Sequence, residues 1–341
     1  MIEIQEQVPL TPYTTFHIGG NAQYFGRIKK QEEIPAYVSF AEKHHIPIHI
    51  LGGGSNTIFG NTTIQQLILH MEESYIRILH THESDVYIEV GAGTLWDEIV
   101  AWTTDRAYTG IEALSAIPGT VGAAPIQNIG AYGQEIQDTL IEVCAYDTKN
   151  HIFVCIPKRL CQFGYRTSIF KKEVRGRYII TSIMLKVSTL LKGVPSYPDI
   201  ENYFKQNPLI LPTPTNVRIA VQEIRKIKLP DPQKIPNAGS FFKNPIITQS
   251  QANTLQEKYP TLKAFPAHEG AVKISAGWLI EQCGLKGATI GSIGIYEKNA
   301  LILTNTGKAT YRDVIHAKEI ITQKVFEIFH ISLEMEPDCI I

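Results

Sequence analysis

Residues 113–134 form a stretch of twenty-two residues without a charged side chain. Its centre, residues 117–133, reads IPGTVGAAPIQNIGAYG and is rich in glycine and alanine. Small residues at this density let backbone N–H groups approach a ligand closely, as in phosphate-binding loops. The usual phosphate motifs, G-x-x-x-x-G-K-[ST] and a G-x-G-x-x-G after a strand, do not occur here. The stretch therefore predicts either a ligand cradle or a buried, tightly turned loop, and these residues alone do not separate the two.

The size and composition of the chain indicate a globular, enzyme-sized protein. It has 341 residues, of which 44% are hydrophobic and 19% charged, and this length predicts two or three domains. The formal net charge is −1, so the chain as a whole has no electrostatic preference for nucleic acid or an anionic membrane. An anionic ligand would have to be bound by local basic residues.

The first residues lack the basic and apolar regions of a signal peptide, so we expect a cytoplasmic protein. The five cysteines are odd in number, widely spread and without a C-x-x-C pair. We expect buried free thiols rather than a disulfide framework or zinc site at Cys144, Cys155, Cys161, Cys283 and Cys339. Four histidines cluster early in the chain, but their spacing fits no metal site, and we expect no bound metal at His44, His45, His80 and His82.

Alternating strand-like and helical patterns predict an α+β or mixed α/β organisation. Strands are expected at residues 46–51, 67–69, 87–90, 141–146 and 178–187. Six prolines at 207–236 indicate a connector, interrupted by one helix. Helices are expected at residues 94–102, 216–227, around 278–280 and at 311–329.

Two further glycine-rich turns precede the uncharged stretch, at residues 14–20 and 51–56. Each turn alone is a weak signal. Three such turns within the first 133 residues predict one extended dinucleotide bound by backbone amides.

Three motifs further along the chain give these turns a context: FGYRTSIFK at 163–171, KLPDP at 228–232 and NAGSFFKNP at 237–245. Together with PIQNIGAYG at 125–133, they resemble the UDP-N-acetylenolpyruvoylglucosamine reductases, the MurB family, over almost the whole chain. The segment around Tyr197 resembles the subclass with an added tyrosine loop over the substrate. In that subclass a glycine follows the tyrosine, whereas Pro198 here stiffens the turn.

The resemblance implies an α+β fold with two parts. One is an FAD-binding domain of the PCMH, or vanillyl-alcohol-oxidase, type, and the other is a smaller C-terminal α+β substrate-binding domain. We expect an FAD-binding region at 1–206, with its core at about 16–187 and a tyrosine-loop extension at about 188–206. Residues 207–330 would form a connector and the substrate-binding domain, and residues 331–341 would return to the active site.

The resemblance also implies the reaction of a UDP-N-acetylmuramate dehydrogenase, in a monomer. NADPH reduces non-covalent FAD, which then reduces the enolpyruvyl ether of UDP-N-acetylglucosamine and yields UDP-N-acetylmuramate for peptidoglycan. The developing enolate needs a fixed cation, which Arg166 would supply, and a rigidly held proton donor, which would be Ser240. The C-terminal LEMEPD matches the family's Leu-x-x-Glu-Val and makes Glu336 the third catalytic residue. Each of the three residues also has an alternative interpretation. Arg166 would be a surface arginine and Ser240 an N-cap or turn serine. Glu336 would be a solvated glutamate, and Asp338 would take its position in the motif.

Binding residues follow from the same resemblance. FAD would contact the turn at Gly52, Gly53, Gly54, Ser55 and Asn56, and the loop at Ile117, Pro118, Gly119, Thr120, Gly122, Ala123, Asn128, Gly130, Ala131, Tyr132 and Gly133. The substrate would contact Tyr197, Arg225, Lys228, Asn244, Lys286 and Asn299.

Two other functions remain open on sequence grounds. One is an oxidase of small alcohols or sugars on the same FAD-binding fold, which would lack the Asn-Ala-Gly-Ser turn and often bind its flavin covalently. The other is a catalytically silent nucleotide-binding or scaffold protein, in which Arg166, Ser240 and Glu336 would have no role.

Overall fold

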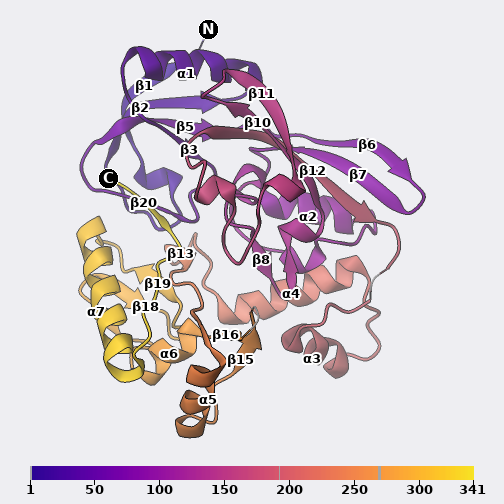
Figure 1. The fold of residues 1–341 in the computed structure, drawn as a ribbon, viewed down its shortest axis with the longest axis vertical. Coiled ribbons are helices and arrows are strands. Elements are labelled where there is room, and N and C mark those ends of the chain that lie inside the picture. Colours follow the sequence, from indigo (N-terminus) through magenta and orange to yellow (C-terminus); the bar gives the residue numbers. More distant parts are fainter. Residues whose placement is uncertain (1, 192, 268–269) are drawn as a thin grey trace. The chain divides into compact units, whose positions relative to one another are not determined.

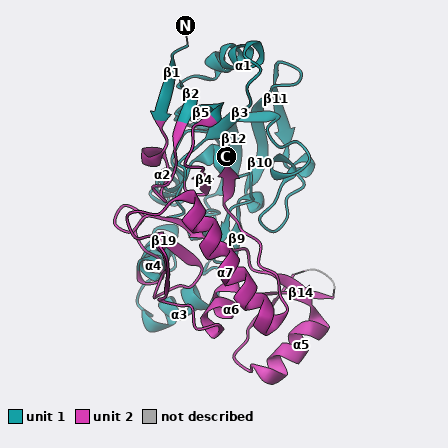
Figure 2. Ribbon diagram, turned by 90° about the vertical axis from the view of Figure 1, so that its left-hand side faces the viewer, with its two compact units in different colours: residues 1–8, 22–54, 65–226 teal, residues 9–21, 55–64, 227–341 magenta. Residues whose placement is uncertain are grey.

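A computed structural model describes residues 2–191, 193–267 and 270–341, and it divides the chain into two compact units. Unit 1 contains residues 1–8, 22–54 and 65–226, and unit 2 contains residues 9–21, 55–64 and 227–341 (Figure 2). The division by contacts differs from the expected boundary at 206/207, because residues 207–226 belong to unit 1 and two N-terminal segments belong to unit 2. Lys192, within the expected tyrosine-loop extension, lies outside the described residues.

The first sheet of unit 1 has the strand order β1-β2-β5-β3. Its parallel pair β3 and β5 places Ile48 opposite Leu67, and the outer ends of β1, β2 and β5 belong to unit 2. The elements are β1 (Ile4–Pro9), β2 (Asn21–Ile28), α1 (Ile34–Lys43), β3 (Ile48–Leu51) and β5 (Ile64–Met71). The expected strands at 46–51 and 67–69 are therefore confirmed, with the first one starting two residues later.

The second sheet of unit 1 is antiparallel, with the order β11-β10-β12-β7-β6. Along β7, Val86, Ile88 and Val90 are buried while the residues between them are partly exposed, which is the alternation of a sheet with one face on the core. Its elements are β6 (Ile76–His82), β7 (Asp85–Gly91), α2 (Trp96–Thr104), β10 (Leu140–Asp147), β11 (Ile152–Pro157) and β12 (Tyr178–Ser188) (Figure 1). All strands expected in this region are confirmed.

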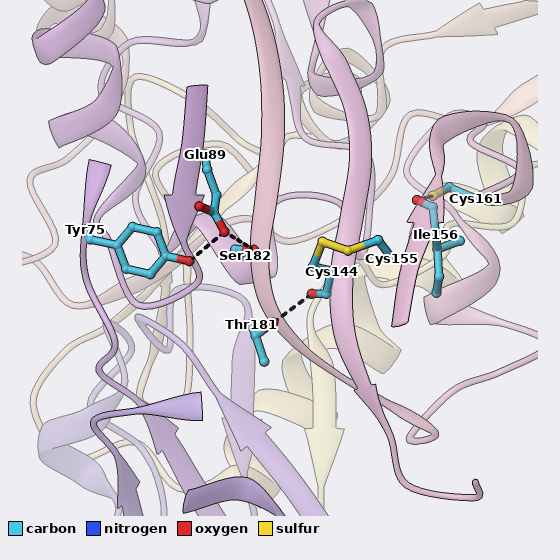
Figure 3. Close-up of a disulfide and its surroundings, with 8 residues drawn as sticks. All are labelled: Tyr75, Glu89, Cys144, Cys155, Ile156, Cys161, Thr181 and Ser182. Carbon is cyan, nitrogen blue, oxygen red and sulfur yellow. Dashed lines mark hydrogen bonds between the residues drawn. A yellow bond between two sulfur atoms is a disulfide. The ribbon is translucent and has the colours of Figure 1, made fainter. Parts of the chain in front are cut away.

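Two cysteines of this sheet correct the sequence interpretation. Cys144 on β10 and Cys155 on β11 are directly opposite each other, with Cα atoms 4.1 Å apart, and form a disulfide (Figure 3). The expectation of five free thiols was wrong for this pair, because the pairing depends on strand register and leaves no spacing motif. Cys161 and Cys283 are buried free thiols, as expected, and Cys339 is free and partly exposed.

A helical layer completes unit 1. Helix α3 (Pro198–Gln206) and helix α4 (Pro214–Lys228) bury one apolar cluster formed by Ala113, Ile200, Phe204, Val217, Ala220, Val221 and Ile224. The helix expected at 216–227 is confirmed, with the apolar residues of its pattern on the buried face. Pro198 is the first residue of α3, where the missing N–H of proline is tolerated.

In its described residues, unit 2 has two antiparallel sheets, the parallel pair of β4 (Thr57–Phe59) and β20 (Asp338–Ile340), and three α-helices around one core. The four-stranded sheet has the order β13-β19-β18-β17, with β13 (Asn237–Ser240), β17 (Thr289–Ile290), β18 (Ile293–Ile295) and β19 (Ile302–Asn305). The smaller sheet has β14 (Ile246–Thr248), β15 (Ala264–Pro266) and β16 (Ala271–Ile274), and the helices are α5 (Gln249–Lys258), α6 (Ala276–Gln282) and α7 (Tyr311–Phe329).

The last strand, β20 (Asp338–Ile340), runs parallel to β4 (Thr57–Phe59), so the C-terminus of unit 2 pairs with its N-terminal part. Helix α7 begins and ends at the expected residues. Thr310 and Asp313 form a reciprocal capping box at its start, and His330 adopts a left-handed φ of 55° after its end. None of the described helices is long and apolar enough to span a membrane.

Candidate functional site

The glycine turn at 52–54 and the loop at 117–120, both in unit 1, lie in direct backbone contact. A Cβ atom on Gly53 would lie 2.9 Å from the Cα atom of Gly119. A Cβ atom on Gly52 would lie 2.3 Å from Oγ1 of Thr120. Neither position has room for a side chain, so the two turns form one continuous backbone surface.

The loop is held by the segment that connects β7 to α2. The N–H of Trp96 donates to the carbonyl of Gly119 at 3.0 Å, and the N–H of Val121 donates to the carbonyl of Thr94 at 2.9 Å. Gly122 donates to the carbonyl of Ala92 at 2.8 Å. These backbone hydrogen bonds resemble those between paired strands. They fix the main chain of Gly119, Thr120, Gly122 and Ala123, in a segment whose side chains are small.

Asn128 is fully buried and its side chain is used within unit 1. Its Nδ2 donates to Glu135 Oε2 at 2.7 Å and to the carbonyl of Gly164 at 3.1 Å, while its Oδ1 accepts from the N–H of Gln137 at 3.3 Å. A cofactor contact at this position would therefore come from the main chain.

Arg166 lies against the same loop. Its Nη2 donates to the carbonyl of Gly130 at 2.8 Å, and its guanidinium lies 5.5 Å from the ring centre of Tyr165. The residue sits in a tight turn closed by Gly164 and Thr167 and has a left-handed φ of 53°, which is uncommon for a residue with a side chain. The structure thus brings two sequence-predicted groups together, the arginine and the loop at 128–133.

The loop ends in a hairpin of β8 (Gly130–Ala131) and β9 (Gln134–Glu135). Its two turn residues, Tyr132 and Gly133, have φ of 50° and 82°, the backbone that a two-residue hairpin requires. The ring of Tyr132 packs edge-on against Tyr197, with centroids 5.2 Å apart. Burial raises the pKa of both phenols.

Arg225 on α4 joins this pair. Burial lowers the pKa of its guanidinium, and attraction to Tyr132 and then Asp97 opposes that shift. Tyr132, Tyr197 and Arg225 therefore form one polar group in unit 1. Three residues assigned on separate motifs converge there.

Ser240 is exposed and ends β13 of unit 2. The preceding Gly239 has φ of 68° and donates its N–H to Oδ1 of Asn237 at 2.9 Å. Asn237 is in turn bonded through its carbonyl to the hydroxyl of Thr15 at 2.6 Å. The serine caps no helix, and a hydrogen-bonded glycine turn fixes its backbone.

Glu336 belongs to the same unit and is 9% exposed, unlike the solvated carboxylate considered above. Its N–H donates to the carbonyl of Phe241 at 2.9 Å, and its carbonyl accepts from Asn56 Nδ2 at 3.4 Å. Asp338 also bonds to Asn56, through its own N–H, and is partly exposed. The backbone of Glu336 is therefore hydrogen-bonded to Phe241, the residue that follows Ser240 in the sequence.

The remaining predicted substrate residues are spread over unit 2. Asn244 Oδ1 accepts from the N–H of Ala276 at 3.0 Å at the start of α6, and Asn299 Oδ1 accepts from the N–H of Leu301 at 3.1 Å. Lys286 pairs with Glu281 at 2.9 Å. Lys228 is exposed at the end of α4. Ser55 and Asn56, which were predicted to contact FAD, also belong to unit 2.

The clustered histidines are placed individually rather than as a set. The ring of His44 packs at a tilt against Phe40 with centroids 4.3 Å apart, and His80 stacks on Tyr87 at 4.2 Å. Across residues 2–191, 193–267 and 270–341, one group of three possible ligand atoms lies within 4.8 Å, that of Glu142, Cys144 and Cys155, and its two sulfurs are bonded to each other in the disulfide.

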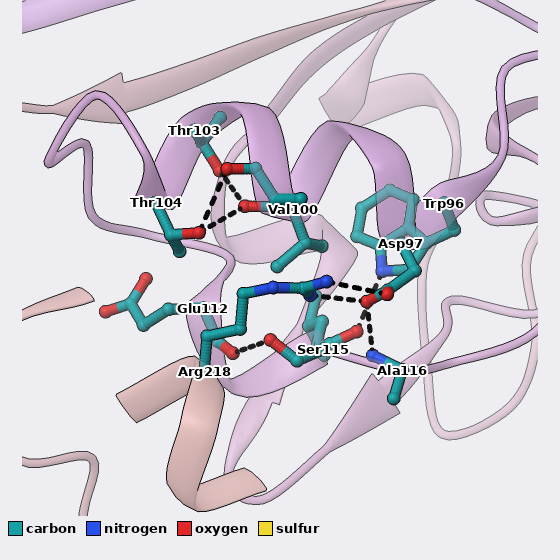
Figure 4. Close-up of polar contacts among 11 residues, drawn as sticks. Trp96, Asp97, Val100, Thr103, Thr104, Glu112, Ser115, Ala116 and Arg218 are labelled. Atoms are coloured by element: carbon teal, nitrogen blue, oxygen red, sulfur yellow. Dashed lines mark hydrogen bonds and ion pairs between the residues drawn. The ribbon is translucent and has the colours of Figure 1, made fainter. Parts of the chain in front are cut away.

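Sequence reasoning missed two charged residues beside the loop, Asp97 and Arg218. They form a bidentate ion pair, and Asp97 also accepts from the N–H of Ala116 (Figure 4). The signal available in the sequence was Arg218 itself, a cation next to Val217 on the apolar face of the helix.

Two domain models match the chain. An FAD-binding domain matches residues 22–155, and the C-terminal domain of UDP-N-acetylenolpyruvoylglucosamine reductase matches residues 231–340. The fold and the two matches define an FAD-binding oxidoreductase with an N-terminal FAD-binding domain, as the sequence predicted.

Curated relatives specify the family. UDP-N-acetylenolpyruvoylglucosamine reductase of Chromobacterium violaceum is 39% identical over 98% of this chain and 98% of its own. The enzyme of the same name from Dechloromonas aromatica is 40% identical over 97% of both chains. The chain belongs to the UDP-N-acetylenolpyruvoylglucosamine reductase family. A Thermus caldophilus structure of that name shares the fold, with a TM-score of 0.68 and 23% identity over 99% of this chain and 98% of that one.

Proposed function

We propose that this protein reduces UDP-N-acetylenolpyruvoylglucosamine to UDP-N-acetylmuramate, a step towards peptidoglycan, with NADPH as reductant and non-covalent FAD as cofactor. Family membership supports the substrate, and the FAD-binding match covers the loop of unit 1. The observation that carries the proposal is the continuous backbone surface of Gly52 and Gly53 against Gly119 and Thr120. It fits a dinucleotide held by main-chain amides.

Bound FAD supplies hydride transfer between NADPH and the enolpyruvyl double bond. The remaining chemistry belongs to the protein. As hydride adds to the terminal carbon, negative charge develops on the enolate, and Arg166 stabilises that charge with a guanidinium held by Gly130. Ser240 then donates its hydroxyl proton to the neighbouring carbon, from a backbone fixed by Gly239. Glu336 provides a carboxyl group on the adjacent segment that can hydrogen-bond the enol.

Binding is divided among the other assigned residues. The amides of the turn at 52–56 and the loop at 117–133 hold FAD. Tyr197 and Arg225 bind the diphosphate of the substrate, since a phenol and a guanidinium are both strong donors to phosphate oxygens. The other contacts to the nucleotide sugar come from Lys228, Asn244, Lys286 and Asn299.

We further propose a cytoplasmic monomer. NADPH and nucleotide sugars are cytoplasmic molecules, and every residue assigned a role comes from one chain, so the chemistry needs no second copy. Light scattering of the purified protein tests the monomer directly.

The experiment is an anaerobic flavin titration. The purified protein is expected to be yellow and to release its flavin on denaturation. NADPH should bleach it, and UDP-N-acetylenolpyruvoylglucosamine should then restore the colour while gaining two hydrogen atoms. Flavin that stays with the denatured protein and responds to a small alcohol or sugar would favour the oxidase. Protein that binds no flavin would favour the scaffold.

A further inference from the structure

Asp97 connects three segments of unit 1. It lies in the first turn of α2, and its Oδ1 accepts from the N–H of Ala116 at 2.5 Å. The guanidinium of Arg218 donates to both carboxylate oxygens, at 2.5 Å from Nη1 and 2.8 Å from Nη2 (Figure 4). Burial acts to raise the pKa of Asp97, but Arg218 and then Ala116 hold it below the usual range. Asp97 therefore carries its negative charge at neutral pH and is bound by α4 and by the loop.

The loop needs an anchor at this place. Ala116 has a left-handed φ of 57°, which costs a residue with a Cβ about 1 kcal/mol or more and persists only when the surroundings impose it. The neighbour of Asp97, Trp96, binds the loop on both sides of Ala116. Its Nε1 donates to the carbonyl of Leu114 at 3.0 Å and its N–H to the carbonyl of Gly119 at 3.0 Å. Trp96 and Asp97 together fix the backbone that enters residues 117–120.

The partner arginine links this anchor to the residues assigned to substrate. Arg218 and Arg225 are seven residues apart on α4, which is close to two helical turns, so both lie on one face. Burial lowers the pKa of the Arg225 guanidinium, and the nearby Tyr132 and Asp97 oppose that shift, so Arg225 lies close to both. One face of α4 is therefore linked to the loop at 113–134 in two places. Arg218 is linked to the start of the loop through Asp97, and Arg225 is linked to its end at Tyr132.

We propose that Asp97 and Arg218 are positioning residues, which couple the substrate arginine on α4 to the loop that holds FAD. Arg218 orients the Asp97 carboxylate, the carboxylate holds Ala116 in its strained conformation, and the loop keeps its cofactor-binding shape. The proposal rests on the proposed function for its substrate effect, but its effect on FAD affinity does not depend on which substrate is reduced.

The chain contains a matched control for this pair. Asp147 is buried and accepts two hydrogen bonds from Arg177, at 2.9 and 2.6 Å, together with the backbone N–H of Lys149 at 3.0 Å. This bidentate pair has the same chemistry, but it joins β10 to the start of β12. Its loss measures the general effect of removing such a pair from unit 1.

The test measures the FAD dissociation constant of the holoenzyme from flavin fluorescence released on dilution, with thermal melting alongside. Asp97→Asn and Arg218→Gln should each raise that constant about tenfold or more and raise the KM for UDP-N-acetylenolpyruvoylglucosamine, with a smaller change in kcat. Asp147→Asn should lower the melting temperature about as much as Asp97→Asn does. It should leave the FAD dissociation constant within about twofold of the native value.

Two variants keep the test decisive. Arg218→Lys retains the charge but not the bidentate geometry, so it should weaken FAD binding by an intermediate amount even where Arg218→Gln folds poorly. The exchange Asp97→Arg with Arg218→Asp restores an ion pair but leaves Ala116 without its acceptor, and it should not recover FAD affinity. Native FAD binding in Asp97→Asn and Arg218→Lys, or full recovery in the exchange, would overturn the proposal. Absence of NADPH-dependent reduction in the native protein would instead reject the proposed function.

Discussion

Glu336 donates its backbone N–H to the carbonyl of Phe241 at 2.9 Å, and this bond joins the C-terminal segment to the residue that follows β13, the strand that ends at Ser240. A glutamate five residues from the end of the sequence is in this way buried beside the proposed proton donor. Position near a chain end does not imply solvation when the segment pairs with a strand, as β20 does with β4.

Glu336→Gln should lower kcat about a hundredfold, because the amide keeps the shape but lacks the acidic carboxyl group that hydrogen-bonds the enol. Glu334→Gln is the control. That side chain is 73% exposed and pairs with Lys243 at the surface, so its loss should change kcat less than twofold. Equal kcat values in the two variants would show that Glu336 is not a catalytic residue and would favour Asp338 in its place.

Arg166→Lys should lower the rate of flavin reoxidation by substrate about a hundredfold, while reduction by NADPH stays close to native. A lysine cannot both bond Gly130 and present a planar, permanently charged fork to the enolate. Stopped-flow measurement of each half-reaction separates the two effects, with the exposed Arg159→Lys as control. A native reoxidation rate in Arg166→Lys would show that this arginine has only a structural role.

Gly53→Ala should weaken FAD binding about tenfold or more, since the new methyl group meets the backbone of Gly119 and one turn must shift at a cost of about 1–3 kcal/mol. Gly176→Ala is a control for backbone strain alone, because that glycine has φ of 78° with nothing within 4 Å of an added Cβ. Fluorescence titration of both variants checks the expectation. It fails if the two variants release flavin equally.

The ion pair at Asp147 predicts part of the acid sensitivity of unit 1. The Arg177 guanidinium lowers the pKa of Asp147 to about 2, from an ordinary value near 3.8. The pair's contribution is therefore complete above about pH 4 and is lost as the pH falls through about 2. Between these values Asp147→Asn should lose less stability than native protein, as thermal melts across the pH range would show. Parallel curves for both proteins would contradict the assigned shift.

Local patterns were sufficient to predict much of the fold. Helix α7 was predicted at both ends, and the capping box at its start and the buried apolar positions along it are consistent with those bounds. The strands β7, β10 and β12 were visible as runs of branched and aromatic residues. The glycine turns were recognised, but their mutual contact was not, because 66 residues separate Gly53 from Gly119.

What the sequence did not reveal depends on long-range register. The disulfide of Cys144 and Cys155 follows from two adjacent strands being aligned residue by residue. The pair of Asp97 and Arg218 joins residues 121 apart, and neither residue belongs to a recognised motif. Arg166, Ser240 and Glu336 were assigned because family motifs mark them, whereas supporting contacts leave no such mark.

The central claim assigns redox chemistry to the flavin and protonation to Ser240, and the half-reactions of Ser240→Ala test it most directly. Ser250→Ala, an exposed serine on α5, serves as control. With NADPH under anaerobic conditions, Ser240→Ala should bleach at the native rate, since flavin reduction does not involve the serine. On addition of UDP-N-acetylenolpyruvoylglucosamine the colour should fail to return within the time that the native protein and Ser250→Ala need. Reoxidation of Ser240→Ala within tenfold of the native rate would contradict the assignment.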